Sequence, residues 1–238
     1  MQPQDQTLGP IQQIRRFPVK SILGESLQKV EIDQRGLVGD RLWAVRHPNG
    51  RLGSGKTTKK RLQQMDGLFR FQARHEGADI LVTMPDGAVY PITHDALDDV
   101  LSQWLEMPVS LVHEEATPHF DDGPISLITT SALRALSQQV GDSIDARRFR
   151  ANLLIESDQI GYIEDQWVNR QIAIGTHVTL RVVAPLRRCV MITNAQQELQ
   201  KDNRVLKTLG SHHDTLFGVW AEVEKGGTVA IGDMAMLR

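Results

Sequence analysis

The chain has very little cysteine, because Cys189 is the single cysteine among its 238 residues. One cysteine cannot form an intramolecular disulfide, and it cannot supply the several ligands of a structural zinc or iron–sulfur site. A free thiol is typical of a reducing compartment. The first residues also lack the basic start and the apolar stretch of a signal peptide. We therefore expect a cytoplasmic protein.

The chain also lacks an excess of positive charge and any long apolar run. Its 27 Lys and Arg residues are outweighed by 29 Asp and Glu residues, which gives a formal net charge of −2. A general nucleic-acid-binding protein shows a basic excess instead. No apolar run approaches the roughly 18 residues that a membrane-spanning helix needs. We therefore expect neither a nucleic acid nor a membrane as partner.

Strand patterns outnumber helical patterns along the sequence. Residues 27–32 alternate apolar and polar side chains with period two, and residues 80–84 and 89–92 flank a Pro-Asp-Gly turn as a hairpin would. Helices are predicted at residues 93–105, capped by Thr93, and from Thr130 or Ser131 to residue 139. Without a regular β-α-β alternation, this pattern predicts a mainly β (α+β) fold, a barrel with peripheral helices.

Residues 113–123 are acidic and poor in apolar side chains. We place a domain boundary there, which divides the chain into an N-terminal strand-rich unit, residues 9–112, and a C-terminal unit, residues 113–238. An ordinary domain size is compatible with two units in a chain of this length.

Residues 50–57 match the phosphate-binding pattern G-x-x-x-x-G-K-[ST] at every fixed position. A working loop of this kind follows a buried parallel strand and precedes a helix. Here the preceding residues contain Arg46 and His47 and end in Pro48-Asn49, which is typical of a hairpin turn. We therefore interpret the match as a basic hairpin loop that can meet an anionic ligand or an acidic partner protein.

Cys189 follows two arginines directly, and nearby positive charge favours the thiolate form that attacks electrophiles or binds a metal. The alternative is a small buried apolar residue, the usual role of a lone cysteine. Other stretches carry lysine, arginine, hydroxyl and amide groups, which together are typical of an anion site, most naturally for phosphate. Their sequences are Phe17-Pro18-Val19-Lys20-Ser21, Gly39-Asp40-Arg41-Leu42-Trp43, Ile128-Thr129-Thr130-Ser131 and Arg147-Arg148-Phe149-Arg150-Ala151-Asn152.

In this order along the chain, these stretches resemble the MOSC family, named for the C-terminal domain of molybdenum-cofactor sulfurases. The stretches around Lys20 and Arg41 are similar to motifs of the family's N-terminal β-barrel domain. The remaining matches resemble the MOSC core: residues 148–152, 164–167, 174–175, 187–189, 217–219 and 232–233. The resemblance implies that residues 9–112 form the N-terminal β-barrel-like domain and residues 113–238 the MOSC core.

The resemblance further implies a molybdenum cofactor, Mo-molybdopterin, in a cleft between the two units. Cys189 would be the catalytic residue and the metal ligand, which suits a soft thiolate on a transition metal. The cofactor-binding residues would be Lys20, Ser21, Arg41, Thr130, Ser131, Arg148, Arg150, Asn152 and Cys189. In the family's amidoxime-reducing members such a site reduces small N-hydroxylated compounds. Because the chain has no cysteine-rich ferredoxin segment, electrons would come from a separate donor protein of ferredoxin, flavodoxin or cytochrome type.

Departures from the family's patterns leave alternatives open. Phe17 stands where the family usually has Tyr, Ala151 replaces a usual Pro, and Thr193-Asn194 departs from a common Thr-x-Asp. The same cofactor contacts would serve a carrier or storage protein without turnover. Cys189 could instead carry sulfur as a persulfide, although the chain shows no pyridoxal-phosphate domain to supply it. A relative of the same fold that binds no cofactor is the remaining possibility.

Overall fold

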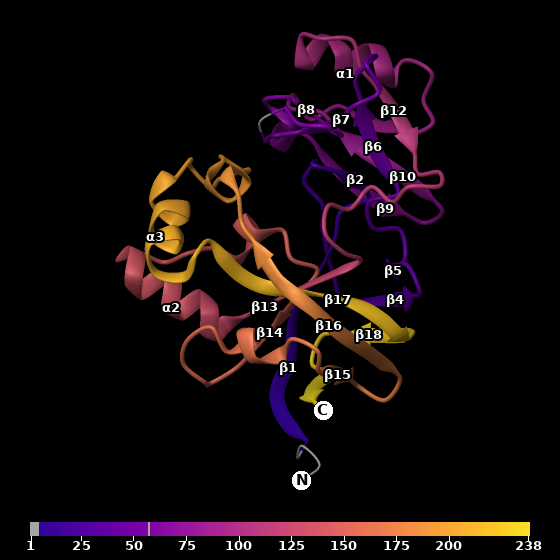
Figure 1. The fold of residues 1–238 in the computed structure, drawn as a ribbon. Coiled ribbons are helices and arrows are strands. Elements are labelled where there is room, and N and C mark those ends of the chain that lie inside the picture. The colour runs from indigo at the N-terminus through magenta and orange to yellow at the C-terminus, as the bar shows by residue number, and fades with distance from the viewer. Residues whose placement is uncertain (1–4, 57) are drawn as a thin grey trace.

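The computed structural model describes residues 5–56 and 58–238, and its largest element is a closed β-barrel (Figure 1). The barrel order is β14-β13-β17-β16-β15-β19-β1, and antiparallel pairing of β1 with β14 closes it, with β3 (Glu25–Leu27) added outside β1. The barrel strands are β1 (Gln6–Arg16), β13 (Ile125–Thr129), β14 (Leu153–Ile155), β15 (Gln171–Ile174), β16 (Val178–Arg187), β17 (Leu216–Lys225) and β19 (Met234–Leu237).

Side chains alternate along the barrel strands as a curved sheet requires. Val178, Leu180 and Val182 of β16 point into the barrel and are at most 2% exposed. They join one apolar cluster with Ile11 and Ile14 of β1. Successive residues of a strand face opposite sides of a sheet, so the period-two pattern of the sequence indicates which side chains face the barrel interior and which face outward. The predicted mainly β fold with peripheral helices is confirmed.

Smaller sheets form a second unit, drawn at the upper right of Figure 1. The hairpin predicted for residues 80–92 is confirmed, because β10 pairs with β11 antiparallel. This unit has its own apolar cluster, which includes Val19, Phe71 and Leu101. Its elements are β2 (Val19–Lys20), β6 (Trp43–Arg46), β7 (Leu52–Ser54), β8 (Leu62–Gln64), η1 (Leu68–Arg70), β9 (Gln72–Glu76), β10 (Asp79–Thr83), β11 (Val89–Pro91), α1 (Leu97–Leu105) and β12 (Ser110–His113).

Strand pairing joins the two halves of the chain in two places. β1, the first strand, lies between β19 and β14 in the barrel. A small separate sheet pairs β18 (Gly227–Ala230) with β4 (Lys29–Asp33), and β4 with β5 (Gly36–Leu37). Segments from before and after residue 113 therefore pack as one barrel region, and the boundary drawn at that residue stays a prediction.

Helices cover one side of the barrel, where α2 (Thr130–Val140) and α3 (Asn203–His213) lie together at the left of Figure 1. The cap of α2 is Thr129, whose hydroxyl accepts from the Ala132 amide at 3.0 Å, so the predicted cap at Thr130 or Ser131 is wrong by at least one residue. Short 3-10 turns η2 (Ala146–Phe149), η3 (Ile163–Trp167) and η4 (Val190–Thr193) connect the remaining strands.

Two further local predictions differ from the structure. The first helix, α1, begins at Leu97 after Ala96, which has no side-chain cap, because the backbone of residues 91–97 turns tightly before it. Thr93 therefore is not its cap. The sequence reading also missed α3, which is capped by Asp202 and buries only Val205 and Leu209 completely. No helix in the described part of the chain is long and apolar enough to cross a membrane.

The segment that matches a phosphate-binding loop is a hairpin instead. Gly53 and Ser54 lie within β7, which pairs with β6 antiparallel and with β8 in parallel. A side chain at position 55 would approach Sδ of Met191 to 2.8 Å, so Gly55 lets this segment pack against η4. Thr57, the last position of the pattern, lies outside the described residues. Without a following helix, the segment lacks the geometry that cradles nucleotide phosphates.

One carboxyl group is buried where η3 meets the barrel. Glu164 is 0% exposed, its Oε2 accepts from the Thr129 hydroxyl at 2.9 Å, and its Oε1 has no hydrogen-bond partner among the described residues. Burial disfavours the charged form and raises the pKa of Glu164 from 4.5 to about 7. Between these two pH values the folded protein holds a proton that the unfolded chain has released.

We predict that the free energy of unfolding falls as pH rises from about 5 to about 8, because the folded protein loses this proton. The folded-state pKa of Glu164 lies above the unfolded value, so the stabilisation is complete below 4.5 and is lost through 7. The loss corresponds to about 3 kcal/mol. In Glu164→Gln the side-chain carbonyl oxygen can still accept from the Thr129 hydroxyl, but the side chain no longer titrates. This variant should therefore lose the pH dependence of the unfolding free energy. Urea unfolding at both pH values measures it, and equal slopes in the variant and the wild type would contradict the assignment.

Candidate functional site

Most of the predicted site residues gather around one open cavity between the second unit and the barrel, which encloses about 850 Å³ including solvent at its open side. Its lining includes seven of the residues selected from the sequence: Lys20, Ser21, Arg41, Arg148, Arg150, Asn152 and Cys189. The structure therefore brings together groups that lie as far as 169 positions apart in the chain.

The cavity is strongly cationic although the whole chain carries a formal charge of −2. Among the described residues that line it, the only carboxylates are Asp121 and Asp122. Its cationic side chains are Lys20, Arg41, Lys56, Arg148, Arg150, Arg187 and Arg188. Because like charges repel strongly where water is partly excluded, such a concentration favours an anionic ligand.

Asp121 joins two of the lysines across the cavity. Its carboxylate accepts from Lys20 at 2.5 Å and from Lys56 through its other oxygen. Burial alone would raise the pKa of Asp121, but the two ammonium groups hold it well below its ordinary value. Lys20 is 5% exposed, and burial lowers its pKa against the attraction of Asp121. This internal carboxylate therefore offsets part of the positive charge.

Arg150 lies against two aromatic rings at the second unit's side of the cavity. Its guanidinium carbon is 4.2 Å from the Phe17 ring centre and 5.1 Å from that of Phe69. Cation–π contact partly replaces the water that burial removes. Burial, and next the charge of Arg41, lower the pKa of Arg150 to about 9. Arg41 itself pairs with Asp40, whose carboxylate also accepts from the Phe17 amide at 2.7 Å.

Cys189 lies half-buried at the junction between β16 and η4. The neighbouring Arg188 donates to the Phe217 and Phe149 carbonyls at 2.8 and 3.0 Å, which fixes the backbone before the thiol. Burial lowers the pKa of Arg188 to about 10. Arg187 is exposed and donates to the Asp214 carbonyl. Of the two arginines before the thiol, only Arg188 is held against buried backbone.

Three arginines of the cavity have unsatisfied hydrogen-bonding capacity. Nη1 of Arg148, Nη1 of Arg150 and Nη2 of Arg188 are buried and have no partner among the described residues. An unpaired buried donor is costly, and most such groups in folded proteins have a partner. Guanidinium donors of this kind match the several oxygens of a phosphate. The donor set therefore fits an anionic, oxygen-rich ligand.

The backbone is strained at several of these positions. Ser21, Arg41 and Arg150 have φ values of 63°, 53° and 52°, in the left-handed region that residues with a side chain rarely adopt. Such conformations persist where the surrounding structure enforces them, and they cluster at ligand sites. Here they end or follow short elements at the cavity wall.

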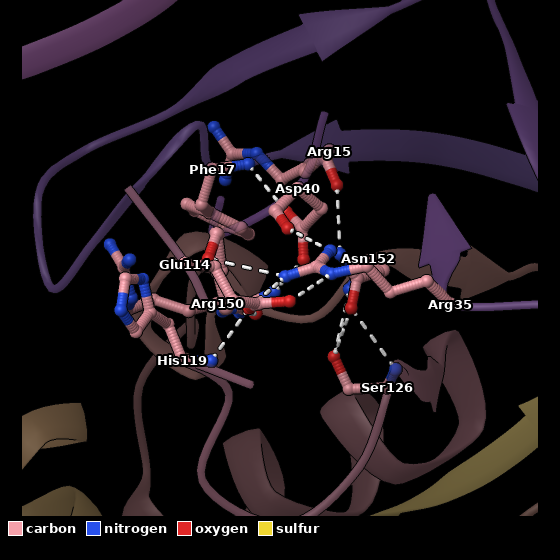
Figure 2. Close-up of polar contacts among 10 residues, drawn as sticks. Arg15, Phe17, Arg35, Asp40, Glu114, His119, Ser126, Arg150 and Asn152 are labelled. Carbon is pink, nitrogen blue, oxygen red and sulfur yellow. Dashed lines mark hydrogen bonds and ion pairs between the residues drawn. The ribbon is translucent and has the colours of Figure 1, made fainter. Parts of the chain in front are cut away.

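Asn152 has a supporting position, as Figure 2 shows. Its side chain is 1% exposed, its Oδ1 accepts from the amide and the hydroxyl of Ser126, and its Nδ2 donates to the Arg15 carbonyl at 3.2 Å. These bonds connect the end of β1 with the start of β13 and β14. Figure 2 also shows Arg35, which donates to both carboxylate oxygens of Glu114 at 2.6 and 2.5 Å and so joins the turn between β4 and β5 to the end of β12.

Thr130 and Ser131 are not part of the cavity lining. The hydroxyl of Thr130 accepts from the Ser157 amide at 2.9 Å, and the hydroxyl of Ser131 donates to the Gly161 carbonyl at 2.6 Å. Both therefore hold the loop after β14 against the start of α2. Their expected contact with a cofactor is without geometric support.

Sequence reasoning did not select several residues that form this site. Asp121 lies in the acidic segment that we interpreted as a boundary, and nothing local indicates its pairing with Lys20, 101 positions away. Lys56 belongs to the basic hairpin loop that we expected to meet an anionic ligand or an acidic partner, and it lines the cavity. Phe69 and Trp220 gave no signal, because isolated aromatic residues are usually core residues.

We predict that Asn152→Ala destabilises the fold by about 2–4 kcal/mol, because it leaves buried partners of the amide unsatisfied. Asn203→Ala, at the exposed start of α3, is the matched control and should stay within about 0.5 kcal/mol of the wild type. Urea denaturation of both variants measures the difference. An unchanged midpoint for Asn152→Ala would mean that its side chain does not hold these strands together.

Known proteins match this chain over nearly its whole length. It is 23% identical to human mitochondrial amidoxime-reducing component 1 over 98% of this chain and 84% of that protein. It is 22% identical to bovine mitochondrial amidoxime reducing component 2, over 96% and 83% respectively. The crystal structure of the YUAD protein from Bacillus subtilis shares the fold with a TM-score of 0.56 at 12% identity, covering 98% of this chain and 97% of that one.

Two family models match the sequence directly. The MOSC N-terminal beta barrel domain matches residues 8–120, and the MOSC domain matches residues 74–235. Since the two matches overlap, they do not fix a boundary between the units. Together they cover the strands and the cavity described above, and the chain belongs to the MOSC family.

Proposed function

We propose that this protein binds the molybdenum cofactor and reduces small N-hydroxylated compounds with electrons from a separate donor protein. The observation that carries the proposal is the position of Cys189 on a cavity where three buried arginine nitrogens have no partner within residues 5–56 and 58–238. A thiolate is a soft ligand suited to a transition metal. The names of the human and bovine relatives point to the same class of reaction.

The proposal gives each part of the cavity a task. Cys189 would hold the metal, while Lys20, Arg41, Arg148 and Arg150 would bind the phosphate and the pterin with Ser21 beside them. Asn152 would act by keeping Arg150 and the adjoining strands in place. When bound, the cofactor supplies two-electron redox chemistry that side chains cannot perform. Overall, an N–OH group takes up two electrons and two protons, and the products are N–H and water.

The basic hairpin loop is a suitable contact for the donor protein. Lys59, Lys60 and Arg61 are exposed and border a hollow that shares Lys20, Lys56 and Asp121 with the cavity. Small electron carriers with acidic surfaces would be steered to such a patch by charge complementarity. We therefore assign ferredoxin-, flavodoxin- or cytochrome-type donors to this face of the protein.

We predict near one molybdenum and one pterin per chain for wild-type protein made in a host that produces the cofactor. Cys189→Ala should lose the metal or bind it less tightly. Arg150→Ala should lower the pterin content, because it removes a buried hydrogen-bond donor to the cofactor's phosphate. Arg74→Ala, which removes a partly exposed arginine outside the cavity, is the matched control and should keep full content. Metal analysis and pterin oxidation products provide the measurement.

Other outcomes of that experiment decide between functions. Full cofactor content without reduction of any amidoxime or hydroxylamine, given a competent donor, would exclude the reductase. Transfer of the bound cofactor to a cofactor-free acceptor enzyme would then indicate a carrier. If neither the wild type nor Cys189→Ala contains metal, the remaining functions are a sulfur carrier and a relative of the same fold that binds no cofactor. Mass spectrometry that detects a persulfide on Cys189 would distinguish these two.

We predict that the double variant Lys59→Glu with Lys60→Glu has a donor-driven kcat/KM roughly tenfold below that of the wild type. Its kcat/KM should also depend less on salt concentration than that of the wild type. Turnover driven by a small chemical reductant should stay within about twofold, because the cavity is unchanged. Lys201→Glu with Lys207→Glu, on exposed lysines beside α3, is the matched control. Equal losses with both reductants would place the effect in the cavity rather than at a docking surface.

A further inference from the structure

A second hollow opens beside the cationic cavity, and the two share Ser21 and Met191. This groove encloses about 1440 Å³, including solvent at its open side. One wall comes from the second unit through η1 and the end of β10, and the other from η4 and the residues that follow it. Since η4 begins directly after Cys189, the segment that carries the thiol also forms a wall of the groove.

The groove is apolar beside the segment that carries the thiol, and Cys189 itself lines the neighbouring cationic cavity. Leu23, Phe69 and Met191 form a small cluster of their own, at most 9% exposed, and Cys189 packs against it. This cluster is separate from the barrel core and from the core of the second unit. An apolar surface therefore packs against Cys189, which also lines the cationic cavity.

The groove wall is adaptable and carries little charge. Three methionines line it, Met65, Met84 and Met191, and an unbranched thioether side chain can adjust to ligands of different shape. Its charged members are Asp66 and Arg70. The Arg70 guanidinium lies 5.0 Å from the Trp104 ring centre, and Asp66 accepts from Gln64 at 3.2 Å, so both have contacts of their own.

The rim supplies neutral hydrogen-bonding groups. Asn194, Gln196 and Gln197 border the groove after η4, and Gln72 borders it on the opposite side. Ligand sites combine apolar walls with a few polar groups in this way, and they bury most of a small molecule. The contrast with the neighbouring cavity, lined by seven cationic side chains, is what separates the two ligands chemically.

We propose that this groove holds the apolar body of the substrate while its N-hydroxylated end lies at Cys189. The substrates would then be neutral N-hydroxylated compounds with an aromatic or aliphatic body, and small polar hydroxylamines would be used less well. This inference rests on the proposed function for its chemistry. A charged body gains little from the groove, because its two charged lining residues, Asp66 and Arg70, are exposed to solvent and opposite in sign.

Two amidoximes with the same reacting group test the proposal, benzamidoxime with a phenyl body and acetamidoxime with a methyl body. Ala195 is exposed and lines the groove, so Ala195→Trp should fill it without disturbing a core. Thr83→Phe should narrow the groove from its opposite wall. We expect the KM for benzamidoxime to rise roughly tenfold or more in either variant, since burial of a phenyl ring is lost. The kcat/KM for acetamidoxime should stay within about twofold.

Ala78→Trp is the matched control, because Ala78 is equally exposed and lies in the turn after β9, outside the groove lining. It should change neither substrate's constants. Molybdenum content is measured in every variant and should equal that of the wild type. Equal changes for the two amidoximes, or no change for either, would overturn the assignment of the groove.

Direct binding separates this inference from the proposed function. Equilibrium dialysis of benzamidoxime with oxidised protein needs no turnover, and binding that weakens in Ala195→Trp but not in Ala78→Trp would support the groove even if no reduction occurs. Reduction of both amidoximes by wild-type protein, with benzamidoxime binding equally well to both Trp variants, would keep the reductase and reject the groove.

Discussion

Positive charge held in a partly dehydrated cavity is the constraint on which the site depends. Guanidinium groups lose hydration there, and the pKa of Arg150 falls to about 9 and that of Arg188 to about 10, in both cases through burial. The protein compensates in part with aromatic rings, with main-chain carbonyls and with the carboxylate of Asp121. Donor capacity that remains unused is best matched by a ligand with several anionic oxygens, because such a ligand satisfies charge and hydrogen bonding together.

Closure of the barrel by the first strand makes this concentration of charge possible. β1 pairs with β14 and β19, and the chain then leaves the barrel directly into the segment that carries Phe17 and Lys20. Asn152 fastens the same junction by bonding Arg15 and Ser126. The site therefore lies where the barrel and the second unit meet, and its residues are held by strand pairing rather than by mobile loops alone.

Cys189 lies between two chemically different surfaces. On one side the cavity carries most of the local positive charge, and on the other Leu23, Phe69 and Met191 offer an apolar wall. Phe69 belongs to both surfaces, since it also contacts Arg150. The thiol thus lies next to both a cationic cavity that suits an anionic, oxygen-rich ligand and an apolar surface that suits a ligand with an apolar body.

Features that depend on neighbours along the chain were predictable from the amino-acid sequence. Period-two alternation predicted the strands, the Pro-Asp-Gly turn predicted the hairpin of β10 and β11, and clustered cations indicated an anion site. The barrel closure, the pairing of Lys20 with Asp121 and the buried, supporting position of Asn152 became visible only in the folded chain. The difference follows from separation along the chain: alternation and turns are local, whereas these contacts join residues more than 100 positions apart, whose meeting depends on how the whole core packs.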